Sequence, residues 1–298
     1  MVHPEENPAA RTPTPSPPHT LPRSIGLSGS GTLAELRADD LTEAGVVLTI
    51  DGVEQSHVET DDPGWLLHDY TVRIGAVLDA LGDGTASTRG RRVLHLGAGA
   101  LTLPRWVEHR AAERHLPAPE QIVLDLEPEL MDFVLETLPM RTRPHTIVAD
   151  AAAALAPSGA LAGRHHDAVV VDLFNSADAP EAVTSTQFCR RLGAIVAPGG
   201  VLVMNLGDEP GLAFARPLIS RLVSGAAAGE AVRCLVTAPA DVLEGAVAGN
   251  LVVAVADAPI RSRAAEAIWA AGPHPCEVLS GHELQVWLAA QEGSANQI

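Results

Sequence analysis

The stretch from Arg91 to Asn205 alternates short apolar runs with segments of helical periodicity. Apolar runs with few polar positions are typical of strands that are buried on both faces. Alternating strands and helices predict a parallel sheet with helices on both sides, so we expect a doubly wound α/β sheet. The expected strands are 93–96, 122–124, 146–148, 168–171 and 201–205.

Most of these strands end in a glycine or an aspartate. The end residues are Gly97, Asp125, Asp150 and Asp172, after the first four expected strands. In an open parallel sheet the carboxyl ends of the strands share one edge, and ligands bind at that edge. We therefore expect these residues to line one site.

A pair of glycines follows the first strand of the sheet. Gly97 and Gly99 flank Ala98 between the strand and its helix, and glycine lets a backbone approach a ligand closely. Small residues also serve close strand–helix packing, so both interpretations stay open for this loop. Thr102 stands where a dinucleotide-binding loop needs its third glycine, which disfavours NAD, and the GK[ST] of a P-loop is missing.

Each strand-end aspartate has a ligand interpretation and a structural one. Asp125 can accept hydrogen bonds from vicinal ribose hydroxyls, or it can join Glu127 and Glu129 as a helix N-terminal charge. Asp150 can accept from the amine of an adenine, or it can cap the helix that follows it. Asp172 ends an apolar strand, where partial burial raises a carboxyl pKa and favours a role as general base; its alternative is a turn or capping role.

The N-terminal part of the chain predicts smaller elements. Residues 1–28 are rich in proline and offer little to bury, so we expect a disordered tail. Residues 29–60 hold a β-branched run, an Asp51-Gly52 turn and a return strand, which predict a small β-hairpin segment. The main α/β domain is expected over 61–298, and its first helix is expected to begin at Asp62-Pro63.

The C-terminal part departs from the alternating pattern. Two strand-like runs, 231–237 and 251–256, follow each other without a long crossover helix. Direct succession predicts an antiparallel hairpin at one edge, which gives a sheet of seven strands. Two helices are expected after it, the last one after Ser280.

Charge and cysteine content restrict the class of partner. The chain has 20 Lys+Arg against 37 Asp+Glu, a net charge of −17, so nucleic acid and anionic membranes are disfavoured as partners. The odd set Cys189, Cys234 and Cys276 contains no CxxC pair, which argues against disulfides and structural zinc. Without a signal peptide or a membrane-length apolar run, we expect a cytoplasmic protein.

The motifs together resemble a known fold and family. Five segments are similar to the class I S-adenosylmethionine-dependent transferase fold: VLHLGAGALTLPRWV, IVLDLEPEL, VADA, HDAVVVDLFNSADAP and APGGVLVMNLGD. Upstream, IDGVEQSHVETDD and WLLHDY resemble the DGxxQ and YHE motifs of the spermidine synthase (polyamine aminopropyltransferase) family, in its divergent bacterial branch. The resemblance covers about residues 31–256.

The resemblance implies a role for each matching residue. It implies that the nucleoside is bound by Gln55, Asp125 and the Asp150–Ala151 pair, beside the loop of Gly97 and Gly99. It implies Asp172 as the general base. The polyamine motifs match at His68 and Asp69, and at Asn175, for which the nearby Asp178 is a possible substitute.

The same alignment has departures. The family acid that faces the aminopropyl tail is Ala100 here, the tyrosine of YHE is Leu67, and the second acid of DxxD is Asn175. The nucleoside half of the site is thus better retained than the polyamine half. Tyr70 is the only tyrosine of the chain, whereas the family lines its amine pocket with several.

Three hypotheses follow for the function. In the first, an aminopropyl group moves from decarboxylated S-adenosylmethionine to a small cationic amine such as putrescine, with Asp172 as base. In the second, which Ala100 favours, a methyltransferase uses intact S-adenosylmethionine. In the third, the fold binds an adenosyl ligand without catalysis. The resemblance also implies a homodimer and no metal.

Overall fold

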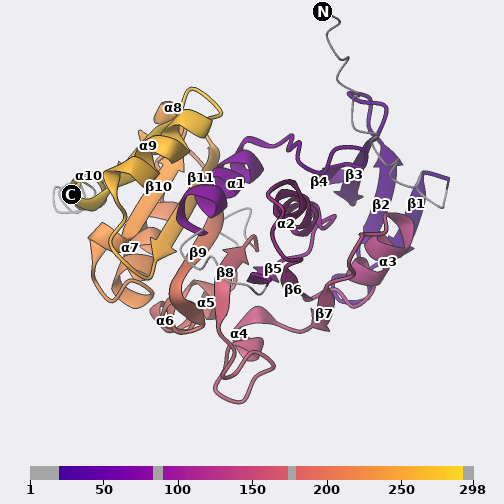
Figure 1. Cartoon of the computed structure of the whole chain (residues 1–298), viewed down its shortest axis with the longest axis horizontal. Helices are drawn as coiled ribbons and strands as arrows, with labels where there is room; N and C mark the ends of the chain where they lie inside the picture. Colours follow the sequence, from indigo (N-terminus) through magenta and orange to yellow (C-terminus); the bar gives the residue numbers. More distant parts are fainter. Residues whose placement is uncertain (1–19, 83–89, 174–178, 291–298) are drawn as a thin grey trace, which may run out of the picture.

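The computed structural model describes residues 20–82, 90–173 and 179–290. It contains two β-sheets (Figure 1), a four-stranded antiparallel sheet near the N-terminus and an eight-stranded mixed sheet. In the N-terminal sheet the strands are β1 (Arg23–Gly26), β2 (Leu33–Ala38), β3 (Gly45–Ile50) and β4 (Val53–Glu59).

The eight-stranded sheet has the order β12-β10-β11-β9-β8-β5-β6-β7. The five strands from β9 to β7 are parallel, as the alternating sequence pattern predicts. At the other side β11, β10 and β12 are antiparallel, which confirms the expected hairpin. The bounds are β5 Arg92–Leu96, β6 Glu120–Asp125, β7 His145–Val148, β8 His166–Val171, β9 Val196–Asp208, β10 Cys234–Ala238, β11 Gly249–Ala256 and β12 Glu277–Ser280.

Helices cover both faces of this sheet. Successive residues of a strand point to opposite faces, so Val169 and Val171 pack with α4, α6 and α7, while Ala168 and Val170 pack with α1, α2 and α9. The sheet is therefore doubly wound, as expected. The helices are α1 Asp69–Leu81, α2 Thr102–Glu113, α3 Leu130–Thr137, α4 Ala151–Ala154, α5 Glu181–Thr184, α6 Thr186–Ala194, α7 Ala215–Gly225, α8 Ala240–Leu243, α9 Ser262–Ala271 and α10 Gly281–Ala289, with a 3₁₀ turn η2 at Ala231–Arg233.

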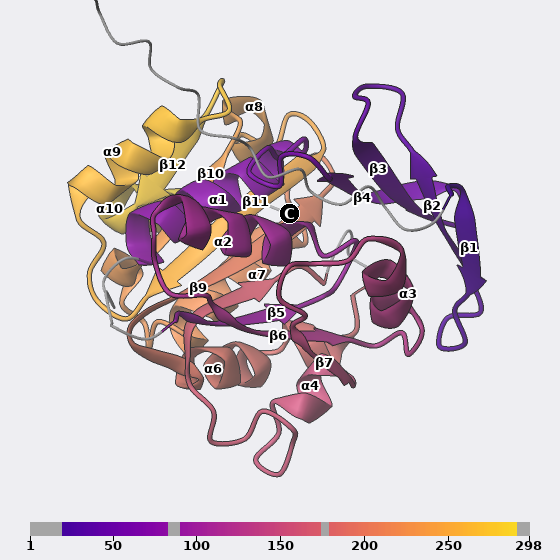
Figure 2. The same ribbon diagram turned by 45° about the vertical axis from the view of Figure 1, so that its right-hand side comes forward.

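The N-terminal sheet packs beside the main sheet through α3 (Figure 2). Leu36 and Leu48 of the small sheet share one buried cluster with Val134 of α3 and Val123 of β6. The loop before β2 also bonds to the start of α3, because the amides of Ser28 and Gly29 donate to the carboxylates of Glu129 and Glu127. These contacts hold the N-terminal sheet against α3 and β6.

The N-terminal segment is larger than the sequence predicted. The tail was expected to extend to Ser28, but Arg23–Gly26 forms β1 and pairs with β2. Leu27, next to this strand, is buried. The proline-rich composition of the tail therefore gave no indication that its last residues pack against the protein. The expected hairpin of residues 29–60 is part of a four-stranded sheet, and its Asp51-Gly52 turn joins β3 to β4.

Two other expectations differ from the structure. The first helix begins at Asp69 and not at Asp62-Pro63, where the Asp62 carboxylate accepts from the Gly64 amide and closes a turn instead. The sheet has an eighth strand, β12, because Glu277–Ser280 pairs with β10 ahead of the last helix. None of the helices within the described ranges is long and apolar enough to cross a membrane.

Candidate active site

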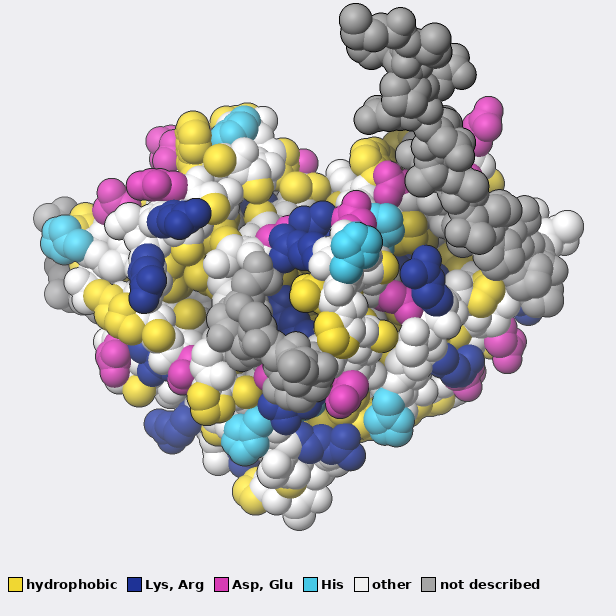
Figure 3. All heavy atoms as spheres, in the orientation of Figure 1, with side chains coloured by type: hydrophobic (Ala, Val, Ile, Leu, Met, Phe, Trp, Pro, Cys, Tyr) yellow, Lys and Arg dark blue, Asp and Glu magenta, His cyan; other side chains and the backbone are white. Residues whose placement is uncertain are grey.

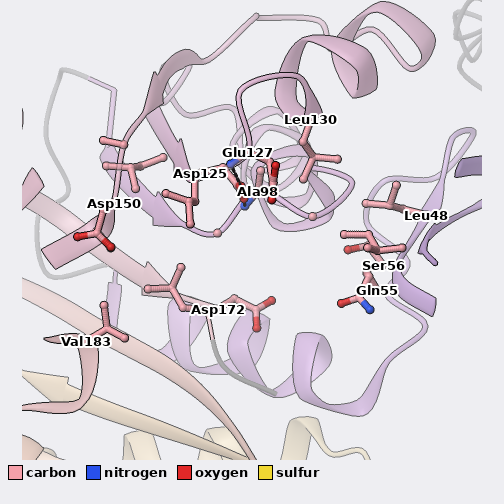
Figure 4. A pocket seen from close by; sticks show the side chains of 18 of the residues that line it. Leu48, Gln55, Ser56, Ala98, Asp125, Glu127, Leu130, Asp150, Asp172 and Val183 are labelled. Carbon is pink, nitrogen blue, oxygen red and sulfur yellow. Dashed lines mark hydrogen bonds between the residues drawn. The ribbon is translucent and has the colours of Figure 1, made fainter. Parts of the chain in front are cut away.

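A cavity of about 320 Å³ opens at the carboxyl edge of the main sheet. Its walls come from the ends of β5, β6, β7 and β8 and from β3 and β4 of the N-terminal sheet (Figure 4). The expected strand-end residues do meet in one place. Seven residues that the sequence analysis selected line this cavity: Gln55, Gly97, Gly99, Asp125, Asp150, Ala151 and Asp172.

The glycine loop is pressed against both walls of the cavity. Gly97 has φ +96°, and a Cβ on it would lie 2.2 Å from the backbone oxygen of Asp172. Gly99 has φ +48°, and a Cβ there would lie 2.3 Å from the Ser56 Oγ. At Gly97 a side chain would collide with backbone, so the close approach to Asp172 requires glycine there. At Gly99 the neighbour is a side-chain hydroxyl, and the positive φ is what favours glycine.

Asp125 holds the glycine loop to the end of β6. Its Oδ2 accepts from the Ala98 amide at 2.8 Å, and its Oδ1 accepts from the Glu127 amide at 2.9 Å. Burial raises the pKa of this carboxyl, and the backbone amides oppose that rise. Each carboxylate oxygen carries two lone pairs, so Asp125 can accept ribose hydroxyls in addition to these amides.

Asp150 lies at the start of α4. Its Oδ1 accepts from the Ala153 amide at 2.8 Å, which confirms the capping role that the sequence offered as the alternative. Asp150 and Ala151 also line the cavity, so capping leaves the expected contact with a base possible.

Asp172 has neutral hydrogen-bond donors around its carboxylate. The Asn205 Nδ2 donates to its Oδ1 at 2.9 Å, and the Tyr70 hydroxyl also bonds to it. Burial raises the pKa of Asp172, while the bonds from Asn205 and Tyr70 and the nearby His68 oppose the rise. Its carboxylate points across the cavity toward Gln55 (Figure 4).

Sequence reasoning did not select Asn205, although a signal was present. Asn205 is 1% exposed and ends the fifth expected strand, so it carries the same strand-end signal as Gly97 and the three aspartates. Because β8 and β9 are parallel with Val171 opposite Met204, Asn205 lies beside Asp172. The strand-end rule, applied once more, would have found it.

The expected polyamine residues are only partly at the site. His68 lines a smaller cavity that adjoins the main one, and its ring stacks on Tyr70 with centroids 5.8 Å apart. Burial is the main cause that lowers the His68 pKa, against the attraction of Glu54. Asp69 is exposed and lines neither cavity, because it lies on the outer side of the first turn of α1.

Two further expected residues, Asn175 and Asp178, lie outside the described residues. The three cysteines are free and buried. Among the described residues, no three His, Cys, Asp or Glu side chains converge as a metal ion requires.

The charged side chains in the described lining of the main cavity are all acidic. Its ionisable acids are Asp125, Glu127, Asp150 and Asp172, and it includes no arginine, lysine or histidine. Such a site attracts cationic ligands, accepts neutral ones and repels carboxylates and phosphates. With a partly buried carboxylate at its centre, it can bind a nucleoside and remove a proton from a bound cation.

The fold was compared with those of solved protein structures. The chain is similar to a probable spermidine synthase from Corynebacterium glutamicum, with a TM-score of 0.76 and 24% identity over 91% of this chain and 95% of that one. The two proteins share one fold. An O-methyltransferase from Bacillus cereus is more distant, with a TM-score of 0.41 and 12% identity over 64% of this chain and 82% of the other. No family model and no curated protein matches the sequence.

Proposed function

We propose that the protein is a divergent spermidine synthase-like enzyme, which moves an aminopropyl group from decarboxylated S-adenosylmethionine to an amine such as putrescine. The amine nitrogen attacks the methylene carbon bound to sulfur. The carbon–sulfur bond breaks, its electron pair stays on sulfur, and neutral methylthioadenosine leaves. Since the sulfonium is an activated leaving group, the protein mainly aligns nitrogen, carbon and sulfur, an effect worth up to about 7–11 kcal/mol.

The arrangement of Asp172 is the observation that carries this proposal. An amine is protonated at neutral pH and must lose a proton before it can attack. Asp172 faces the cavity from the end of β8 and is held by Asn205 and Tyr70, so its free lone pairs can accept that proton. Its raised pKa brings it closer to the value that suits a base at neutral pH.

The remaining lining supports a nucleoside donor. Asp125 has the lone pairs for ribose hydroxyls, and Asp150 with Ala151 lies where the base would fit. Intact S-adenosylmethionine adds a carboxylate to the donor, and the described lining offers it four acids and no cationic side chain. The charge of the cavity therefore favours the decarboxylated donor.

A methyltransferase that uses intact S-adenosylmethionine is the second candidate. Ala100 favours it, because an acid that would hold the aminopropyl ammonium is missing at that position. Ala100 is fully buried and lines neither cavity, so the tail of the donor has no partner there.

A panel of ligands separates these candidates. Thermal shifts are measured with decarboxylated S-adenosylmethionine, intact S-adenosylmethionine and methylthioadenosine, followed by mass analysis of products with a set of amines. The proposal predicts the largest shift with the decarboxylated donor and a product heavier than the amine by one aminopropyl unit. A larger shift with the intact donor and a methylated product would replace it by the second candidate. Binding without any product would mean a non-catalytic protein.

The same proposal includes a cytoplasmic homodimer that acts in polyamine biosynthesis, as the resemblance implies. Sedimentation velocity of the full chain measures the oligomeric state, and a single species of monomer mass would remove the dimer from the proposal.

A further inference from the structure

A buried histidine lies inside the main sheet, directly beneath the candidate site. His95 is 2% exposed and belongs to β5, where its neighbours are apolar. It pairs with Val170 of β8, so His95, Val170 and Asp172 point to the same face of the sheet. An imidazole is costly to bury in such a place unless its polar atoms are satisfied.

Contacts around His95 fix which ring nitrogen carries the proton. Gln121 donates its Nε2 to the Pro104 carbonyl at 2.9 Å, which orients the amide and leaves Oε1 as the acceptor. This Oε1 lies 2.9 Å from the His95 Nε2, so Nε2 must be the protonated nitrogen.

The ring is neutral at physiological pH. Burial lowers the His95 pKa to about 4; the bond to Gln121 opposes this, and the positive charge of Arg91 acts in the same direction as burial. In this tautomer Nδ1 is a hydrogen-bond acceptor. It is buried and has no hydrogen-bond partner among the described residues.

A small cavity supplies room for that missing partner. It has a volume of about 30 Å³ and is lined by His95, His68, Tyr70 and Asp172, among others. Roughly 10–15 Å³ is enough for one water molecule, provided that polar groups surround it. The cavity is polar and adjoins the main site at Asp172 and Tyr70, which line both cavities.

We propose that one water molecule occupies this small cavity, donates a hydrogen bond to the Nδ1 of His95, and carries the proton away from Asp172. His95 is then a positioning residue that acts through the water. This inference rests on the proposed function, because the proton is the one that Asp172 takes from the amine.

The route of the proton follows from the lining. When donor and amine fill the main cavity, Asp172 cannot release its proton in that direction. The protonated carboxyl of Asp172 gives its proton to the water, and the water gives one of its own protons to His68. The His68 Nε2 lies 3.4 Å from the Glu54 Oε1, whose side chain is 42% exposed. Burial lowers the His68 pKa and Glu54 only partly opposes it, so the imidazolium is short-lived and passes its proton on to solvent beside that carboxylate.

The first test is a high-resolution crystal structure of the wild-type protein with methylthioadenosine. It should contain a water within hydrogen-bond distance of the His95 Nδ1. His95→Leu should lack this water, whereas His95→Asn should keep it, because the amide oxygen takes the place of Nδ1. An empty cavity in the wild type would overturn the inference and leave the proposed function untouched.

The second test is kinetic. His95→Leu should lower kcat by about tenfold, less than the 10²–10⁴-fold effect of a direct acid–base group, with the thermal shift by methylthioadenosine unchanged. The solvent deuterium isotope effect on kcat should also differ between His95→Leu and the wild type. His95→Asn should restore both kcat and the isotope effect to the wild-type values. His166→Leu is the matched control, since His166 is 3% exposed and lines neither cavity, and its Nε2 has no hydrogen-bond partner within the described part of the chain.

The outcomes of these experiments are distinguishable. An ordered water combined with an unchanged kcat in His95→Leu would overturn the relay alone. Equal losses of kcat in His95→Leu and His166→Leu, without rescue by His95→Asn, would assign the effect to the fold and also overturn it. A wild-type protein without any transfer would overturn the proposed function and, with it, the relay.

Discussion

At the scale of single residues, burial of the proposed base, Asp172, has a cost in stability. Burial raises its pKa, so the folded protein disfavours the ionised form, and stability is lost as the pH rises through that raised pKa. Asp172→Asn removes the ionisation while it keeps an acceptor for Asn205. We expect the variant to have a higher thermal midpoint than the wild type at pH 8, with the difference shrinking in acid.

The same variant should lose turnover by roughly 10²–10⁴-fold and retain its thermal shift with methylthioadenosine. Glu120→Gln is the control, because Glu120 is an exposed acid at the opposite, amino end of β6. Unchanged turnover in Asp172→Asn would remove this residue from its role as base.

Asn205 adjusts the pKa of the proposed base, Asp172, through one hydrogen bond. Its Nδ2 donation lowers the pKa of Asp172, so Asn205→Leu should raise that pKa further. Since the base must be ionised to act, the acidic limb of the kcat/KM profile should move to higher pH. Asn250→Leu, on the neighbouring strand β11 and away from both cavities, should leave the profile in place. An unshifted acidic limb in Asn205→Leu would show that the profile reports a different group.

At the scale of elements, the contact between β5 and β8 depends on a missing side chain. In Gly97→Ala the new Cβ meets the backbone oxygen of Asp172 at 2.2 Å, so the two strand ends must separate. We expect a loss of about 1–3 kcal/mol in the free energy of unfolding and a smaller thermal shift with methylthioadenosine. Gly163 also has a positive φ, +69°, but open space around it, so Gly163→Ala should cost only the backbone strain and leave ligand binding intact. Equal effects of the two substitutions on binding would contradict this account.

The alternating strands and helices from Arg91 to Asn205 were predictable, because a strand that is buried on both faces consists of a run of apolar residues. The carboxyl-end rule then placed Gly97, Asp125, Asp150 and Asp172 in one cavity, and the structure confirms this grouping. Strand β12 was missed because one of its four residues is exposed and the other three are only partly buried, so they show no apolar run. Strand β1 was missed because its side chains alternate between partly buried and exposed beside a proline-rich stretch.

Contacts between distant segments were not predictable from local patterns. The bond between Tyr70 and Asp172 joins α1 to β8, and the tautomer of His95 depends on Gln121 in another strand. In their local sequence, Tyr70 looks like any buried aromatic residue and His95 like any buried histidine. Asp69 shows the converse, because it matched a motif but its helix turns it to solvent.

At the scale of the whole molecule, a net charge of −17 surrounds a cavity that is itself acidic. Basic and acidic side chains are interspersed on the face shown in Figure 3. Such a field attracts a cationic amine, and salt screens it over about 10 Å at 0.1 M ionic strength. We expect the KM for a diamine to rise with sodium chloride, while the affinity for neutral methylthioadenosine stays constant in isothermal titration. A KM that does not depend on salt would show that long-range charge has no part in binding the amine.

The most direct measurement is a crystal structure of the full chain with methylthioadenosine. The ribose hydroxyls should bond to Asp125, the base should lie beside Asp150 and Ala151, and the sulfur should face Asp172. A nucleoside bound elsewhere, or a ribose out of reach of Asp125, would contradict the account.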